Sequence, residues 1–449
     1  MASPISPPRG MRDFLPAEKA RREAALATIR RVYRTHGFDE IETPVVEDHA
    51  RLHSGLGGDN EKLAYSILKR GLDADALRAA ADGGGVASLA DLGLRFDLTV
   101  PLARFYATHR AELGPVFRSL QVAPVWRAER PQKGRYRQFV QCDIDIIGEP
   151  GPLAEVELLS ATTAALRALG IDGFRIRLND RRLLVGMLER FGFPADEHPG
   201  VLITVDKLDK IGHDGVVAEL RGRGVTASAV DALEAFFRRP QTMEFVPFGE
   251  RQIRKALPDG VDDGVVADLA GIGLAATAQS HVDAPSLGDP RFARDLVVFD
   301  PFLVRGMGYY TGPIFEIEHP DFGYSLGGGG RYDGMIGRFL GQDVPATGFS
   351  IGFERIVDVA ATTVDEHDDA VVLVHEADAD PAVLVRLKSE LIAGGVSRVR
   401  FERRAKNLRA LLDRVATDGF SRFAIVPREG EGDGGDAVTG DRLEFRPLA

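Results

Sequence analysis

Residues 139–147 alternate between apolar and polar side chains, and this pattern predicts a β-strand with two unlike faces. One face carries Gln141, Asp143 and Asp145, and the opposite face is apolar, with Cys142 on it. A chain that contains such a strand must pack the apolar face into a core. The polar face then lies either in solvent or on the floor of a binding site.

The length and composition are those of a multidomain globular protein. A chain of 449 residues suggests about three structural units. Hydrophobic residues make up 44% of the chain, which is enough for sizeable cores and argues against a mostly disordered protein. The net charge of −11 excludes a non-specific coat for nucleic acid, although local basic strips can still bind phosphates.

The cysteine and histidine content narrows the class further. The single cysteine, Cys142, cannot form an internal disulfide, which excludes a disulfide-rich secreted scaffold and favours a reducing, cytoplasmic environment. The first ten residues lack an apolar signal sequence, and no apolar run approaches the ~20 residues that cross a bilayer. We therefore expect no membrane partner. The ten histidines form neither an HExxH motif nor a cluster, so we also expect no metal site.

The first third of the chain is expected to mix helix and strand. Residues 16–36 predict a helix, because Pro16 suits a first turn and apolar residues recur at helical spacing. Residues 38–46 are strand-like, residues 74–90 suggest a loop or hairpin, and residues 94–148 predict mostly strands joined by a charged loop.

The remainder predicts two domains of α/β (α+β) class. Residues 1–360 form the first domain, with an inserted helical module at about 195–290 that carries no catalytic signature. Strand–helix alternation over residues 367–449 predicts a small α/β domain. The run at 327–330 is all glycine and lacks the Lys-Ser/Thr of a P-loop, but it permits a close backbone approach. A helix is expected to begin near Gly348.

Three separated arginines are candidates for binding phosphate. Arg127 ends a predicted strand, Arg305 follows one, and Arg355 lies at a helix start. A single arginine is usually a solvated surface charge. Three at the ends of elements can clamp a triphosphate, because guanidinium is planar, multiply donating and permanently charged. The sequence alone does not show that they converge.

The loop at 127–137 has five basic residues and only one acid, Glu129. Either it is a charged hairpin tip on an acidic protein, or it is a flexible positive loop for a nucleotide or the end of a nucleic acid. Asp97-Leu98-Thr99 is also expected on a strand, which would add a further carboxylate and hydroxyl to a polar sheet face.

Taken together, these segments resemble the class II aminoacyl-tRNA synthetases, and among them the histidyl-tRNA synthetase family. Residues 126–148 are similar to motif 2, and residues 348–356 to motif 3. Residues 303–317 (LVRGMGYYTGPIFEI) and 327–335 (GGGGRYDGM) are similar to segments peculiar to the histidine enzymes. The resemblance implies an antiparallel-sheet catalytic core with a helical insertion, followed by an anticodon-binding domain at 367–449. The segment HGFDEIETPVVE resembles motif 1, which implies a homodimer.

The resemblance implies ATP-dependent activation of L-histidine to histidyl-adenylate and transfer to tRNA(His), with Mg²⁺ accompanying ATP. Arg127 is similar to the arginine on the α-phosphate, and Glu129 and Phe139 to the groups that read and stack on adenine. Arg355 matches the arginine on the γ-phosphate. Arg305 matches the arginine that approaches the α-phosphate and the substrate carboxylate, so Arg305 and Arg127 are the catalytic candidates.

The family resemblance also implies the histidine site. Residues that would hold the α-amino group and the imidazole ring are Asp97, Thr99, Gln141, Asp145, Tyr309 and Tyr310. Asp145 and Tyr310 are similar to the residues that hydrogen-bond the two ring nitrogens. A site that pairs both nitrogens rejects analogues lacking them by ~10⁴–10⁵. Two departures from the family pattern are Gly308, where Asp is common, and Asp97, where the bacterial motif has Glu.

Four basic residues are the tRNA-binding candidates: Arg130, Lys133, Arg403 and Arg404. The first two belong to the positive loop. The other two belong to a basic run at 398–409, which is either a solvated face or a contact for phosphates near the anticodon.

Two other functions remain open on sequence grounds. One is a non-catalytic regulatory paralogue in histidine biosynthesis, which usually has degraded motifs and no C-terminal domain. The other is a histidine-activating enzyme with an acceptor other than tRNA.

Overall fold

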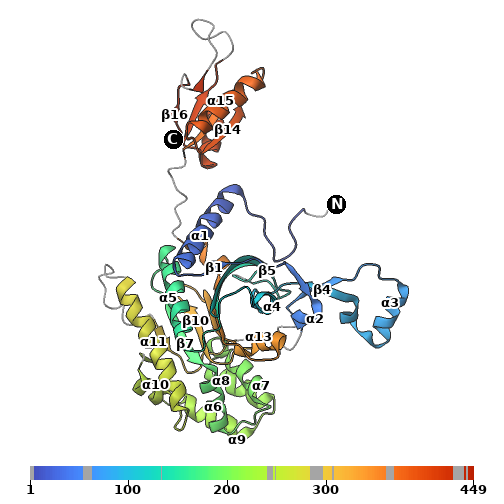
Figure 1. Ribbon diagram of the computed structural model, residues 1–449, viewed down its shortest axis with the longest axis vertical. Helices are drawn as coiled ribbons and strands as arrows, with labels where there is room; N and C mark the ends of the chain where they lie inside the picture. Colours follow the sequence, from blue (N-terminus) through green and yellow to red (C-terminus); the bar gives the residue numbers. More distant parts are fainter. Residues whose placement is uncertain are drawn as a thin grey trace. The chain divides into compact units, whose positions relative to one another are not determined.

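The computed structural model divides into two compact units: Met1–Asp13 with Ala25–Ala361, and Phe14–Ala24 with Thr362–Ala449. Helix α1 (Pro16–Thr35) contributes residues to both units (Figure 1). The residues that the structure describes are 5–53, 63–132, 134–239, 246–247, 249–283, 297–305, 308–360, 369–427, 439–440 and 443–448.

The first unit is built on a nine-stranded sheet with the order β1-β5-β6-β12-β11-β10-β7-β9-β8. The run from β5 to β7 is antiparallel throughout, whereas β1–β5 and β7–β9 are parallel pairs. The strands are β1 (Asp39–Glu40), β5 (Phe117–Trp126), β6 (Gln138–Ile147), β7 (Arg175–Asp180), β8 (Val246–Pro247), β9 (Val297–Phe299), β10 (Pro313–Glu318), β11 (Gly327–Arg331) and β12 (Ala346–Gly352). This architecture confirms the expected α/β (α+β) fold with a largely antiparallel central sheet.

The apolar face of β6 lies in the core, as its alternation predicts. Cys142, Ile144 and Ile146 are completely buried. Tyr33 of α1 lies close to Cys142 and to Thr162 of α5 (Leu153–Ala168), so both helices cover this face of the strand. The opposite face of β6 is therefore left to carry the polar residues.

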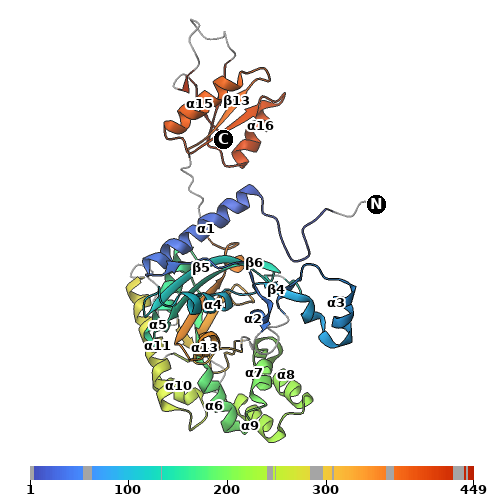
Figure 2. The same cartoon turned by 45° about the vertical axis from the view of Figure 1, so that its right-hand side comes forward.

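Helices fill the long connection from β7 to β9. They are α6 (Arg181–Phe191), α7 (His198–Val205), α8 (Leu208–Gly222), α9 (Ala227–Phe237), α10 (Glu250–Ala256) and α11 (Asp263–Asp283). The helical content agrees with the expectation for residues 195–290. The short strand β8 also lies in this stretch and pairs with β9, and α11 packs on α5, so the connection joins the sheet rather than standing apart (Figure 2).

Three expectations about local structure are wrong. Residues 74–90 form helices, namely α3 (Ala74–Ala79) followed by turns of π- and 3₁₀-helix, and the Asp73 side chain caps α3. Residues 94–148 contain α4 (Thr99–His109), which begins directly after Asp97-Leu98. Gly348 lies inside β12, and the helix α14 (Phe353–Ile356) begins only after it.

The smaller elements complete the first unit. A three-stranded sheet has the order β2-β4-β3, with β2 (Val46–Asp48), β3 (Tyr65–Leu68) and β4 (Ala90–Leu94). The excursion that bears α3 extends outward from this small sheet in both ribbon views (Figures 1 and 2). The short helix α2 (His49–His53) packs on β4, and α13 (Asp333–Leu340) packs on α4.

The second unit holds a four-stranded sheet with the order β14-β13-β15-β16. Its elements are β13 (Ala370–His375), α15 (Pro381–Ala393), β14 (Arg398–Arg403), α16 (Leu408–Thr417), β15 (Arg422–Ile425) and β16 (Arg446–Pro447). Alternate residues of β13 point to two separate cores: Val371 packs with Leu387 of α15, and Val372 packs with Val415 of α16. Strand–helix alternation therefore produces a small α/β layer structure, as expected.

A buried ion pair ties β11 to α5. The Arg331 guanidinium donates from Nε and Nη2 to the Glu155 carboxylate at 2.7 and 2.9 Å, and both side chains are at most 9% exposed. Arg118 of β5 makes the same two-pronged contact with Glu157 of α5 at 2.6 and 2.8 Å, but those side chains are 30% and 27% exposed.

The two pairs differ in burial and should therefore differ in their effect on stability. We expect Glu155→Gln to cost roughly 3–5 kcal/mol, because it removes the buried carboxylate that accepts both hydrogen bonds of the pair and leaves Arg331 only the half-buried carboxylate of Asp333, at 3.4 Å. The matched control Glu157→Gln should cost about 0–1 kcal/mol. The only tryptophan, Trp126, ends β5, so fluorescence-monitored urea unfolding reports on this unit. Equal losses in the two variants would contradict the assignment.

Candidate active site

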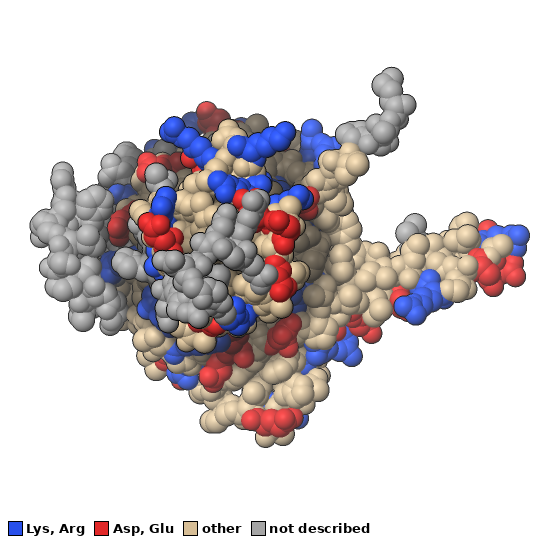
Figure 3. All heavy atoms as spheres, turned by 90° about the horizontal axis from the view of Figure 1, so that it is seen from above, with Lys and Arg blue, Asp and Glu red and all other residues tan. Residues whose placement is uncertain are grey.

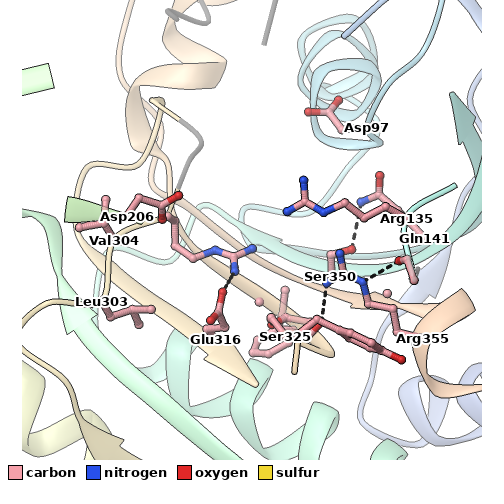
Figure 4. A pocket seen from close by; sticks show the side chains of 18 of the residues that line it. Asp97, Arg135, Gln141, Asp206, Leu303, Val304, Glu316, Ser325, Ser350 and Arg355 are labelled. Atoms are coloured by element: carbon pink, nitrogen blue, oxygen red, sulfur yellow. Dashed lines mark hydrogen bonds and ion pairs between the residues drawn. The ribbon is translucent and has the colours of Figure 1, made fainter. Parts of the chain in front are cut away.

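The polar face of β6 forms the floor of a pocket of about 820 Å³ in the first unit. Gln141, Asp143 and Asp145 line it and are 6%, 4% and 3% exposed. The sequence left this face either in solvent or in a site, and the structure places it in the pocket. Figure 4 shows Gln141 directed toward Ser350 of the neighbouring strand β12, with Asp97 above them.

Burial of three carboxylates at one end of the pocket raises their pKa values. Burial is the main cause in each case: it raises the pKa of Asp97 to about 6 and that of Asp145 to about 7. The pKa of Asp143 is raised as well, by burial and then by the charge of Asp145. The Tyr332 hydroxyl donates to Asp145 at 2.7 Å and acts in the opposite direction.

Two adjacent tyrosines close the same end of the pocket. Tyr309 and Tyr310 are at most 9% exposed, and their rings pack edge to face with centroids 4.8 Å apart. The Tyr309 hydroxyl interacts with Thr99, which is the first residue of α4 rather than a strand residue. The structure thus brings Asp97, Thr99 and both tyrosines together with the β6 face, as the family resemblance implies.

The three candidate arginines converge in the same pocket. Burial lowers the pKa of Arg355 to about 10, and the next causes are the nearby guanidiniums of Arg135, Arg305 and Arg127. Arg127 is fixed by donation from Nε to the Phe96 carbonyl at 3.0 Å. A cluster of three half-buried guanidiniums beside the exposed Arg135 is a site for a polyanion.

Arg305 is held by acidic residues on two sides. Its guanidinium forms an ion pair with Glu316 of β10, and Asp206 at the end of α7 lies close by (Figure 4). Burial alone would lower the pKa of Arg305, but Glu316, Tyr310 and Asp206 more than offset it, so its pKa is raised. Arg305 therefore stays charged at neutral pH.

The glycine run of β11 makes room for these side chains. A Cβ atom on Gly328 would lie 2.8 Å from the Arg305 guanidinium carbon and 2.6 Å from the Phe315 carbonyl oxygen. A Cβ atom on Gly330 would lie 2.9 Å from the Tyr310 ring. The run is thus a full strand in the middle of the sheet, where glycine allows functional side chains to lie flat on the backbone.

The remaining nucleotide-site candidates also line the pocket. The Arg127 guanidinium lies 5.0 Å from the centroid of the Phe139 ring. Glu129 accepts from Arg135 at 3.2 Å, and its backbone carbonyl accepts from Arg137 at 3.0 Å. The carboxylate and the backbone carbonyl of Glu129 therefore fix two arginines of the loop after β5.

Three of the four tRNA-binding candidates are described, and none of these three lines the pocket. Arg130 is exposed, and Lys133 is outside the described residues. Arg403 and Arg404 are exposed in the second unit, where Arg404 pairs with Glu376 at 2.9 Å.

Sequence reasoning missed several lining residues: Arg177, Asp206, Glu316, Tyr332 and Ser350. Glu316 and Tyr332 lie inside the two segments that resemble the histidine enzymes, so their position alone could have marked them. Arg177 and Asp206 come from the β7–α8 region, where the sequence shows no motif. Arg177 pairs with Asp300 and with Asp209 of α8, which links the helical connection to the pocket wall.

Comparison with known proteins agrees with this geometry. The profile of the family described as Histidyl-tRNA synthetase matches residues 10–356. The histidine--tRNA ligase of Leifsonia xyli subsp. xyli (strain CTCB07) is 60% identical over 427 residues, which are 95% of this chain and 96% of that protein. The chain belongs to the histidyl-tRNA synthetase family.

More distant relatives match the chain at lower identity. The histidine--tRNA ligase of Aeropyrum pernix is 41% identical over 78% of this chain and 73% of that protein. The crystal structure of histidyl-tRNA synthetase from Nostoc sp. PCC 7120 covers 95% of this chain and 92% of its own, with a TM-score of 0.70 and 26% identity. Among the described residues of this family member, no helix is long and apolar enough to cross a membrane.

The raised pKa of Asp145 predicts a pH-dependent stability in the absence of substrate. The folded state binds the Asp145 proton more tightly than the unfolded state, so stability is lost as pH rises toward 7. Asp145→Asn removes this loss and keeps an acceptor for Tyr332. Relative to wild type, we expect the variant to gain about 2–3 kcal/mol between pH 5 and pH 8. A stability difference that is the same at both pH values in urea unfolding would refute the assignment.

Proposed function

We propose that this chain ligates L-histidine to tRNA(His) in two steps, with histidyl-adenylate as the intermediate and AMP and pyrophosphate as products. The observation that supports this best is the lining of one pocket, which holds the buried carboxylates Asp97, Asp143 and Asp145 together with the guanidiniums of Arg127, Arg305 and Arg355. An amino acid brings an ammonium for the carboxylates, and ATP brings a polyanion for the guanidiniums, so one pocket can take both substrates.

The guanidiniums are proposed to act on the phosphates. In-line attack of the histidine carboxylate on the α-phosphate concentrates negative charge, which Arg127 and Arg305 are placed to stabilise. Arg355 would hold the γ-phosphate, and Phe139 with Glu129 would hold adenine. No protein nucleophile is needed, because the attacking group is the substrate's own carboxylate.

The histidine end is proposed to work by hydrogen bonding. Asp97, Thr99 and Gln141 would receive the α-ammonium group, and Asp145 and Tyr310 would bond the ring nitrogens, with Tyr309 packed beside them. The burial of these groups supports the assignment, because an analogue that leaves them unpaired would bind much more weakly.

Mg²⁺ is expected to enter with ATP. Among the residues that the structure describes, no group of three or more His, Cys, Asp or Glu side chains is arranged to hold a metal ion. The phosphates and water would therefore supply most of its ligands, as is usual for Mg²⁺ on nucleotides. When bound, the ion would neutralise phosphate charge beside the arginines.

A non-catalytic regulatory role is the less favoured reading. A solved structure titled as an ATP phosphoribosyltransferase regulatory subunit/histidyl-tRNA synthetase from Bacillus halodurans has a TM-score of 0.70 at 18% identity, which is a likeness of fold alone. Two features argue against a regulatory role, because the regulatory paralogue usually lacks both. The pocket keeps its three arginines, and the chain has a second, C-terminal unit. Histidine-dependent ATP–pyrophosphate exchange followed by charging of tRNA distinguishes the enzyme from the regulator and from an enzyme with another acceptor.

A homodimer in the cytoplasm is part of the proposal. The motif 1 resemblance supports the dimer, and its strand β1 lies at the edge of the nine-stranded sheet. The single cysteine is buried in the core, which suits a reducing compartment. Sedimentation at micromolar concentration tests the dimer.

Loss of Arg305 should impair adenylation. We expect Arg305→Ala to reduce the rate of histidine-dependent pyrophosphate exchange by roughly 10²–10³, comparable to removing one donor of an oxyanion hole. The control Arg251→Ala removes an exposed arginine of α10 and should leave the rate within about twofold. Near-normal exchange in Arg305→Ala would remove this residue from the mechanism.

Contact between the second unit and tRNA should appear in the salt dependence of binding. Both signs of charge are interspersed over the face in Figure 3, so phosphate binding must depend on local groups. Arg403 of β14 is exposed and forms no ion pair among the described residues, so Arg403→Gln should lower the log–log salt slope by about one unit.

The matched control for this test is Arg446→Gln. Arg446 is an exposed arginine of β16, at the opposite edge of the same sheet. The log–log salt slope of tRNA binding by Arg446→Gln should equal that of the wild type. The tRNA contact fails if Arg403→Gln binds tRNA with an unchanged slope, or if both variants change it equally.

A further inference from the structure

Asp143 is a buried carboxylate that the proposed roles of the neighbouring residues do not use. It lies between Gln141 and Asp145 on the pocket face of β6 and is 4% exposed. Its strand partners in the sheet are Gln121 of β5 and Ser350 of β12. A buried carboxylate costs free energy unless it is paired or hydrogen-bonded, so the role of Asp143 depends on the groups that it contacts.

The contacts of Asp143 fix the orientation of the Gln141 amide. Gln141 Nε2 donates to both carboxylate oxygens of Asp143, at 3.3 and 3.1 Å, and lies 3.0 Å from Ser350 Oγ. Both carboxylate oxygens accept from the NH₂ group of the amide, which is the only donor on the Gln141 side chain. The amide oxygen of Gln141 is therefore turned the other way.

This orientation leaves two buried acceptors without a donor. Gln141 Oε1 and Asp97 Oδ2 have no hydrogen-bond partner among the described residues. No Lys, Arg or His nitrogen in the described part of the chain lies within ion-pair distance of Asp97, Asp143 or Asp145. An unpaired buried acceptor costs about 1–3 kcal/mol, so this end of the pocket is complete only with a cationic donor bound.

We propose that Asp143 is a positioning residue for the α-ammonium group of histidine, which acts by holding Gln141 with its amide oxygen toward that group. An ammonium has three N–H donors and no acceptor, so it can satisfy Gln141 Oε1 and Asp97 Oδ2 together. This inference rests on the proposed activation of histidine and adds the residue that selects an amino acid with a free α-amino group.

The test compares ligands with and without the ammonium group in an isosteric variant. In Asp143→Asn the new side chain can donate as well as accept, so the Gln141 amide loses its single orientation. We expect the KM for histidine in pyrophosphate exchange and the inhibition constant of histidinol to rise roughly 10- to 100-fold, the effect of losing a hydrogen bond to a charged group. The KM for ATP should change less than about threefold.

The deaminated analogue 3-(imidazol-4-yl)propionate separates positioning from general disruption. It keeps the ring and the carboxylate but has no ammonium, so its inhibition constant should be the same in Asp143→Asn and wild type. The control is Thr347→Val, which alters a fully buried polar side chain of β12 on the opposite face of the sheet. It should leave unchanged the KM values for histidine and ATP and the inhibition constants of histidinol and of the deaminated analogue.

A double-mutant cycle then asks whether Asp143 acts through Gln141. Once Gln141→Ala is present, adding Asp143→Asn should raise the KM for histidine by much less than it does alone. The inference is overturned if the deaminated analogue weakens as much as histidine, or if the two substitutions are additive. If wild type shows no histidine-dependent exchange, the proposed function itself fails, which is a different result.

Discussion

Strand β6 is hydrogen-bonded along its length on both sides, to β5 and to β12. Its register is thereby fixed, and a shift by one residue would exchange its two faces. Cys142 and its apolar neighbours then face the core, so Gln141, Asp143 and Asp145 are directed into the pocket. The positions of Asp143 and Asp145 in the pocket depend on this pairing, and the helices that cover the apolar face of β6 support it.

The pocket holds charges of both signs that are unevenly balanced. Asp143 and Asp145 have no ion-pair partner among the described residues, and Asp97 has only the more distant charge of Arg127. Arg355 lies near three other guanidiniums, whereas Arg305 is paired with Glu316. Buried charges that are unpaired or lie beside like charges are unfavourable, so ligands that carry an ammonium and a polyanion would stabilise the pocket. The glycines of β11 leave room for Arg305.

The sequence predicted most of this site, because strand alternation and local motifs report on local structure. Alternation of polar and apolar residues with a period of two predicted the polar face of β6 and the buried Cys142. Strand–helix alternation predicted the elements of the C-terminal unit. Convergence of the arginines did not follow, since it depends on the order of strands in the sheet. Thr99 was misplaced because the pattern predicts a strand at Asp97, whereas Asp97 Oδ1 accepts from the Val100 N–H at 3.2 Å in the first turn of α4. Asp206 lies at the end of α7, and nothing in its surrounding sequence marks it as a pocket residue.

The central claim is that one pocket binds the ammonium and ring of histidine beside its carboxylates and the phosphates beside its guanidiniums. A crystal structure with a non-hydrolysable histidyl-adenylate analogue tests it most directly. The account predicts the ammonium against Asp97 and Gln141, and the phosphate mimic between Arg127 and Arg305. An analogue bound in the reverse direction, or outside this pocket, would contradict the account.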